Sequence, residues 1–268
     1  MKKIIALILA MVMALGLAAC GSSGGDEGGT GGNTSKIVLG SSVDYPPFEF
    51  HILEGGESKA VGIDIFLGEQ IAKDMGAECE VVDMSFDNLL TLMAQGNCDI
   101  VIAAMEAKPE RTENADCSDP YYSDLPPIII TKKGNEGQYK SLDDFSGKTV
   151  GAQLATTKAD IVNDEMTGAI PQLMSSVIDL VNNLVNDKCD ALVLDGAVAK
   201  KYLEINDNLA AVDIDMGEAA EPYRVWVAKG DPKGLLPKIN ETIARVTTDG
   251  TIESWIEQAN ELASSAAE

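Results

Sequence analysis

The sequence has a single histidine, His51, among 268 residues, which limits any mechanism that needs a histidine pair or triad. Basic residues are also scarce, because 20 Lys and Arg stand against 43 Asp and Glu, and the formal charge is −23. Binding nucleic acid needs a basic face that displaces counterions, so nucleic acid is excluded as a partner. Hydrophobic residues make up 45% and charged residues 24% of the chain, a balance typical of a protein that buries a core.

An uncharged run covers residues 4–19, directly after Lys2 and Lys3. At 16 residues it is shorter than the about 20 that a membrane-spanning helix needs. A basic pair followed by a short apolar run is typical of a secretory signal. The sequence therefore predicts an exported protein, with residues 1–19 as its signal peptide.

The signal ends in Leu17-Ala18-Ala19-Cys20, which resembles the lipobox of bacterial lipoproteins. This resemblance implies that Cys20 carries a lipid and anchors the mature protein to the outer face of the bacterial cell membrane. A conventional signal with an incidental cysteine is the alternative. Residues 20–35 include many glycines and serines, which predict a flexible tether between the lipid and the folded part.

The other four cysteines are Cys79, Cys98, Cys117 and Cys189. They show no C-x-x-C spacing and no clustering with His51, so we expect no metal site. An exported protein can pair its cysteines, but we favour buried free thiols over disulfides.

From residue 36 the chain alternates strand-like and helix-like segments, which predicts α/β lobes with helices covering mostly parallel sheets. Two segments, residues 89–102 and 180–193, match at an offset of 91 residues, with Cys98 aligned to Cys189 and Asp99 to Asp190. Each contains an apolar helical stripe, a polar stop and a strand, so we expect two similar lobes. Ala104 in one lobe and Asp195 in the other follow such strands, at the sheet edge where open α/β sheets bind ligands.

Five motifs stand in order along the chain: Asp44-Tyr45-Pro46-Pro47-Phe48-Glu49-Phe50, Val61-Gly62-Ile63-Asp64-Ile65, Pro109-Glu110-Arg111, Ser118-Asp119-Pro120-Tyr121-Tyr122 and Asp249-Gly250-Thr251. Together they resemble the family 3 extracellular solute-binding proteins of ABC importers. The resemblance implies a type II periplasmic-binding-protein-like fold, with two lobes joined by a two-strand hinge. Lobe one would comprise residues 36–125 and 223–268, and lobe two residues 126–222.

The resemblance also implies the function. We expect a receptor that captures a free amino acid, polar or cationic, between closing lobes and delivers it to an ABC transporter permease. We expect no catalysis and no cofactor, a monomer, and contact with the membrane only through the lipid anchor. A dehydratase-like enzyme and a ligand sensor on the same scaffold are the alternatives.

A free α-amino acid is a zwitterion, so its site needs one fixed cation and one fixed anion. Arg111 follows Pro109 at a predicted helix start, where the family places the arginine that binds the ligand carboxylate. Asp195 follows an apolar strand, where the family places the aspartate that binds the ligand ammonium.

The resemblance assigns four more side chains to the site. Thr156 and Thr157 match a hydroxyl pair that donates to the ligand carboxylate, although adjacent threonines also serve as helix caps. Tyr45 and Phe86 match the aromatic walls on either side of the ligand. Ser42, near the inner end of the side-chain pocket, weakly suggests a polar ligand.

Two positions depart from the family pattern. Glu106 stands where the family has Ser or Thr, and Lys108 stands where it has Thr. Glu106 either helps to neutralise Arg111, binds a cationic group of the ligand, or turns outward. As an acid in an unexpected place, it is also the main argument for the enzyme alternative.

Overall fold

The computed structural model describes residues 35–217 and 221–266. The predicted signal peptide, the predicted lipidation site Cys20 and the predicted tether up to residue 34 lie outside the described residues. Ser35, which we expected in the tether, is instead the first residue of strand β1 (Ser35–Ser41). In the part of the chain that the structure describes, no helix has the length and apolar character to cross a membrane.

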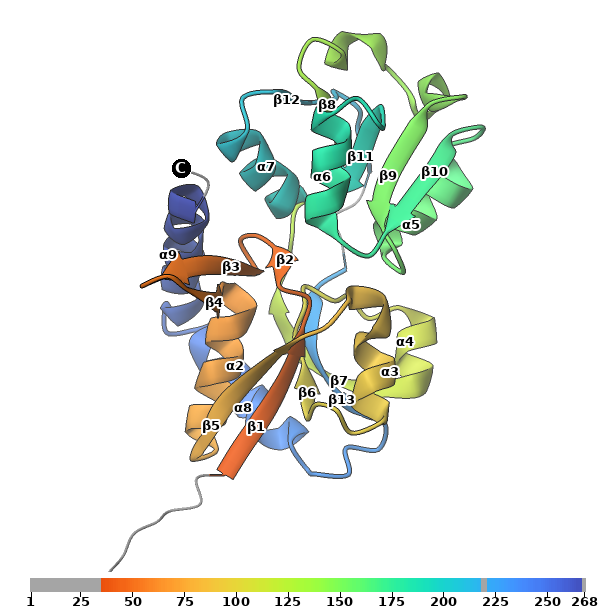
Figure 1. Cartoon of the computed structure of the whole chain (residues 1–268). Coiled ribbons are helices and arrows are strands. Elements are labelled where there is room, and N and C mark those ends of the chain that lie inside the picture. The colour runs from red at the N-terminus through yellow and green to blue at the C-terminus, as the bar shows by residue number, and fades with distance from the viewer. Residues whose placement is uncertain (1–34, 218–220, 267–268) are drawn as a thin grey trace, which may run out of the picture. The chain divides into compact units, whose positions relative to one another are not determined.

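Two five-stranded sheets organise the chain, and we call the parts built on them lobe one and lobe two (Figure 1). In lobe one the order is β5-β1-β6-β13-β7, and only β13 runs against the other strands. Besides β1, its strands are β5 (Ala77–Asp83), β6 (Ile100–Val101), β7 (Ala115–Tyr122) and β13 (Tyr223–Ala228).

Lobe two repeats this arrangement in the order β10-β9-β11-β8-β12, with only β8 reversed. The prediction of mixed, mostly parallel sheets in two similar lobes is therefore confirmed. The strands are β8 (Ile128–Lys132), β9 (Thr149–Gln153), β10 (Ile170–Met174), β11 (Ala191–Leu194) and β12 (Leu209–Ala211).

The internal repeat is supported by a hydrogen bond that occurs at equivalent positions in both lobes. The Asp99 carboxylate accepts the backbone N–H of Val38 at 2.7 Å, and the Asp190 carboxylate accepts that of Thr149 at 2.8 Å. In each lobe the aspartate lies at the start of one parallel strand and accepts an N–H of the neighbouring strand, because a buried N–H needs an acceptor.

Helices cover both faces of each sheet, as the apolar spacing predicts. In lobe one, Ile100 faces the core under α2 and α8, and the next residue, Val101, faces the core under α3. The helices are α2 (Ile63–Asp74), α3 (Leu89–Ala94), α4 (Pro109–Asn114), α5 (Thr157–Asp160), α6 (Val177–Val185), α7 (Gly196–Ile205), α8 (Leu236–Val246) and α9 (Thr251–Ala266), with short 3₁₀ turns at Phe86–Asn88, Glu136–Gln138 and Leu142–Phe145 and a π-helical turn at Ile161–Glu165.

A small antiparallel sheet, β2-β3-β4, was not predicted from the sequence. Its strands are β2 (Asp44–Tyr45), β3 (Glu49–Glu54) and β4 (Glu57–Val61). Gly55 and Gly56 connect β3 to β4 with φ angles of 63° and 89°, the positive values that a two-residue hairpin turn requires.

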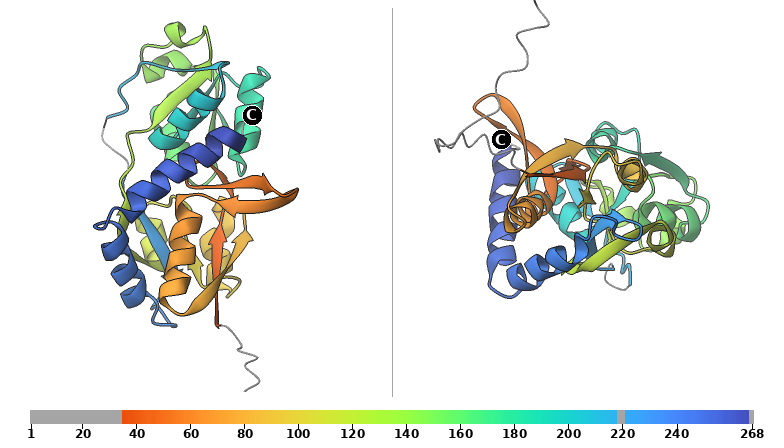
Figure 2. Two further views of the ribbon diagram at one scale, coloured as in Figure 1. Left: turned by 90° about the vertical axis from the view of Figure 1, so that its left-hand side faces the viewer. Right: turned by 90° about the horizontal axis from the view of Figure 1, so that it is seen from below.

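The chain passes between the sheets twice, after β7 and before β13. The boundaries predicted at residues 125/126 and 222/223 fall within these passages and stay a prediction. Apart from these two passages, helix α9 also contacts α7 of lobe two (Figure 2). There the buried Lys201 ammonium of α7 donates to the Asn260 carbonyl and the Ser264 hydroxyl of α9, both at 3.2 Å.

Gly62 explains why the second motif contains glycine. Its φ is 125°, and a Cβ there would lie 2.2 Å from the Phe48 carbonyl oxygen. Any other residue would clash with the backbone and occupy a disfavoured conformation. The close approach places Asp64, at the start of α2, where it accepts the N–H of Ala104 at 2.7 Å.

Candidate functional site

Side chains from both lobes meet at the edges where the parallel strands end. Lobe one contributes Tyr45 from β2 and Glu106 and Arg111 from the segment between β6 and β7, and lobe two contributes Lys158 from α5 and Asp195 after β11. All five are buried, with Arg111 the most exposed at 9%. The structure therefore brings together the predicted cation and the predicted anion.

Asp195 occupies the N-cap position of α7 but caps nothing. Its Oδ2 accepts a hydrogen bond from the Tyr45 hydroxyl at 2.6 Å, which connects the two lobes. Its Oδ1 lies 2.6 Å from the Lys158 ammonium but receives no hydrogen bond of acceptable geometry from the described residues. Burial and the neighbouring charge of Glu106 raise the pKa of Asp195 to about 6, although Lys158 opposes the rise.

Lys158, which the sequence analysis did not single out, lies at the centre of the site. Its ammonium is 2.6 Å from Glu106 Oε1 and 2.6 Å from Asp195 Oδ1, so it bridges a carboxylate from each lobe. Burial works against its charge, but the two carboxylates raise the pKa of Lys158, and the lysine stays protonated. In the sequence it follows two threonines at a helix start, which gave no signal of a buried position.

Glu106 turns into the site, so the outward orientation that we considered is wrong. Its Oε2 accepts from Arg111 Nη1 at 3.2 Å, and its Oε1 also accepts from the Thr157 hydroxyl at 2.9 Å. Although burial alone would raise its pKa, Lys158 and Arg111 hold the pKa of Glu106 at about 2. Glu106 therefore does neutralise Arg111, which was the first of the alternatives.

Arg111 is fixed from three sides. Besides Glu106 Oε2, its guanidinium donates to the Glu106 carbonyl at 2.8 Å and to the carbonyl of Ala155 in lobe two at 2.9 Å. It also stands over the ring of Phe86 at 5.3 Å from the centroid, a cation–π arrangement. Phe86 thus lies against the predicted cation, and Tyr45 lies against the predicted anion.

The two threonines have different surroundings. The Thr156 hydroxyl accepts the N–H of Ala159 at 3.1 Å and donates to the Gln153 carbonyl at 2.6 Å, so it caps α5 within lobe two. The Thr157 hydroxyl faces Glu106 across the lobes. Only Thr157 is therefore directed into the site.

Ala104 and Ser42 lie behind the charged residues. Ala104 has a φ of 45° and is buried, with its N–H donated to Asp64. The Ser42 hydroxyl donates to Asp44 at 3.4 Å, and Asp44 in turn accepts the N–H of Val177 in lobe two at 2.8 Å. Asp44 is thus a further acid between the lobes that the sequence analysis did not assign.

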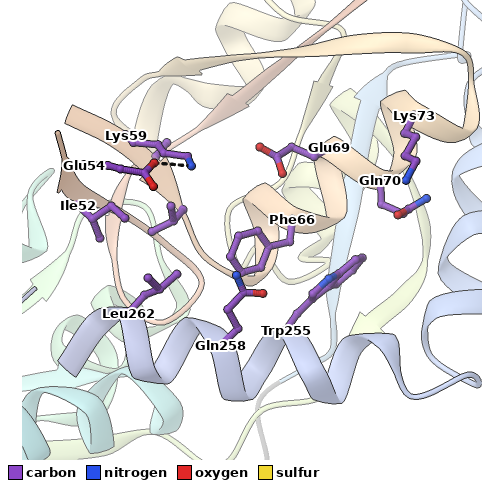
Figure 3. A pocket seen from close by; sticks show the side chains of 12 residues that line it. Ile52, Glu54, Lys59, Phe66, Glu69, Gln70, Lys73, Trp255, Gln258 and Leu262 are labelled. Carbon is purple, nitrogen blue, oxygen red and sulfur yellow. Dashed lines mark hydrogen bonds and ion pairs between the residues drawn. The ribbon is translucent and has the colours of Figure 1, made fainter. Parts of the chain in front are cut away.

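Two cavities lie near these elements. One, of about 530 Å³, is lined by Phe86, Met105, Arg111 and Ala155 and opens beside the charged residues. The other, of about 480 Å³, lies on lobe one between the β3–β4 hairpin, α2 and α9, where Figure 3 shows Phe66 of α2 beside Trp255 of α9. Of the predicted residues, Phe86 and Arg111 line the first cavity and none lines the second, so the first cavity adjoins the candidate site on the side of Arg111.

The arrangement suits binding of a head group that carries one positive and one negative charge. Two acids and two bases share the site, and no group of three or more His, Cys, Asp or Glu able to hold a metal occurs among residues 35–217 and 221–266. His51 is exposed on β3, and the four cysteines in the described chain are free thiols, of which Cys98 and Cys189 are buried and Cys79 and Cys117 are half-buried.

Comparison with known proteins shows the family of this chain. The sequence profile of the bacterial extracellular solute-binding proteins, family 3, matches residues 37–259. The chain belongs to this family. The solute-binding protein is 33% identical over 221 residues to the arginine-binding extracellular protein ArtP of Bacillus subtilis, a match that covers 81% of this chain and 83% of ArtP.

Two further relatives of the solute-binding protein differ in the ligand they are named for. The L-cystine-binding protein TcyJ of Escherichia coli is 30% identical over 226 residues, which cover 83% of this chain and 81% of TcyJ. The crystal structure of the amino acid ABC transporter substrate-binding protein AbpA of Streptococcus pneumoniae, bound to L-arginine, superposes with a TM-score of 0.81 at 30% identity. That match covers 85% of this chain and 96% of AbpA.

Proposed function

We propose that this solute-binding protein captures a free α-amino acid between its lobes and delivers it to an ABC transporter permease. The observation that carries the proposal is that Arg111 from lobe one and Asp195 from lobe two lie in one buried site, where Glu106 and Lys158 link them. Family membership supports the transport role, and relatives named for arginine and cystine support an amino acid as the ligand class.

The contacts suggest how the ligand is held. The ligand carboxylate binds the Arg111 guanidinium and the Thr157 hydroxyl, both of which now serve the Glu106 side chain. The ligand ammonium donates to Asp195 Oδ1, the atom that lies 2.6 Å from the Lys158 ammonium, so the ligand and Lys158 share this carboxylate. Tyr45 and Phe86 flank the ligand between these two ends.

The energy required is modest. A micromolar dissociation constant corresponds to about −8 kcal/mol. Two charge-assisted contacts and burial of the ligand between the aromatic rings supply this after the entropy of association is subtracted. Closure of the lobes adds contacts that exist only in the bound state.

Glu106 does not support the enzyme alternative. A general acid at neutral pH needs a pKa near 7, whereas Arg111 and Lys158 hold the pKa of Glu106 at about 2. We therefore propose a binding protein without catalysis. We also propose that it acts as a monomer outside the cell membrane, held there by a lipid on Cys20.

A thermal-shift screen of the mature protein against the common amino acids tests the proposal. A ligand at 100 times its dissociation constant stabilises the folded state by about 2.7 kcal/mol, which is easily detected. For the amino acid that gives the largest shift, calorimetry should show a loss of about 2–5 kcal/mol in Arg111→Ala, because a buried charge of the ligand is left unpaired.

Arg245→Ala is the matched control. Arg245 is exposed and pairs with Asp74 outside the site, so its removal should leave the affinity unchanged. A screen in which no amino acid stabilises the parent protein would refute the proposed function.

A further inference from the structure

The charged groups in mutual contact are two carboxylates, Glu106 and Asp195, and two cations, and they balance only because one of the cations is Lys158. Glu106 and Asp195 are both buried, and the Lys158 ammonium touches each of them at 2.6 Å. Without that ammonium, Arg111 would still contact Glu106, and Asp195 would have no cation in contact among the described residues. Two more acids, Asp44 and Asp124, lie in the same region between the lobes, where they accept the N–H groups of Val177 and Ala197 in lobe two.

Burial makes ligand binding more sensitive to any net charge of the site. Water screens charges poorly there, and the potential of one uncompensated charge extends across the whole ligand. A zwitterionic head group adds no net charge. The charge of the ligand side chain is therefore the quantity to which the site is most sensitive.

We propose that Lys158 is a specificity-determining residue, whose ammonium cancels one carboxylate of the site and so sets the charge class of amino acid that is accepted. The inference rests on the proposed function and deepens it. With Lys158 present, the charges in contact are balanced, and without Lys158 the excess of carboxylates favours a cation on the ligand side chain.

Arginine and citrulline are a suitable pair of probes, because they have the same length and differ in the charge of the terminal group. The measured quantity is the ratio of the citrulline dissociation constant to the arginine dissociation constant, from calorimetry on each variant. In Lys158→Gln the ratio should increase about tenfold or more, the effect of one charge at about 10 Å at the effective dielectric constant of a protein site.

Glu106→Gln should move the same ratio in the opposite direction, because the Lys158 ammonium is then in excess. This second variant keeps the test valid if Lys158→Gln does not fold. Lys201→Gln is the matched control, because Lys201 is an equally buried lysine of lobe two whose partners lie on α7 and α9. Its ratio should equal that of the parent.

An unchanged ratio in Lys158→Gln, or a decrease, overturns the inference while leaving amino-acid binding intact. If the parent binds neither probe, arginine binding gained in Lys158→Gln supports the inference and its absence overturns it. If the parent binds no amino acid at all, the proposed function itself fails.

Discussion

Replacing Asp195 with Asn should weaken ligand binding and stabilise the protein at the same time. Asn keeps the shape of the side chain and an oxygen for the Tyr45 hydroxyl, but it removes the charge that the ligand ammonium needs. Truncating one partner of a buried charge pair costs about 2–5 kcal/mol. The dissociation constant should therefore rise about 30-fold or more.

The gain in stability follows from the pKa of Asp195. Burial raises it from 3.8 to about 6, even with Lys158 beside it. At pH 7.5, which is above both the ordinary and the raised pKa, the ionised carboxylate therefore lowers the free energy of unfolding. Asn carries no charge, and we expect Asp195→Asn to raise the free energy of unfolding by about 1–3 kcal/mol.

Two measurements check this prediction: calorimetry with the amino acid found in the screen, and urea denaturation without ligand at pH 7.5. Asp190→Asn is the matched control, because the Asp190 carboxylate accepts the Thr149 N–H at 2.8 Å outside the site. That variant should lose stability and keep its affinity. Asp195→Asn would refute the reasoning if it bound within about threefold of the parent, or if it lost stability together with binding.

Two further predictions concern stability. Burial raises the pKa values of Asp44 and Asp64 to about 6, like that of Asp195, so the folded state binds more protons than the unfolded state between about pH 4 and 6. The free energy of unfolding from urea denaturation should therefore rise as the pH falls from 8 to about 5. A maximum of that free energy at pH 8 would contradict the prediction. Gly62→Ala should lower the free energy of unfolding by about 3 kcal/mol or more, because its Cβ would clash with the Phe48 carbonyl. Gly137→Ala is the control, because a Cβ at Gly137 would meet open space. Equal melting curves for the two variants would contradict the prediction and show that the backbone adjusts.

The regular elements could be predicted because their patterns are local. The apolar stripe of α6 and the buried run of β11 each identify one element without reference to the rest of the chain. The β3–β4 hairpin was missed although Gly55-Gly56 is a turn signal, because its strands are short and largely exposed. The role of Thr156 could not be predicted from the sequence either, since a hydroxyl that caps a helix and one that faces a ligand look alike in a sequence.

Lys158 could not be predicted, because its environment is made by residues far away along the chain. Glu106 is 52 positions before it and lies in the other lobe, and Asp195 follows a different strand. A lysine in the first turn of a helix is ordinarily solvated, and only the tertiary fold shows that it is buried between two acids.

The pairing of Glu106 with Lys158 accounts for the main departure of this chain from its family's pattern. In the proposed binding mode, a buried glutamate beside Arg111 would by itself repel the ligand carboxylate. A buried lysine beside Asp195 would by itself compete with the ligand ammonium. Because Glu106 and Lys158 contact each other at 2.6 Å, their charges cancel, and the net charge of the four groups is that of Arg111 and Asp195. Each residue is therefore compatible with amino-acid binding only in the presence of the other.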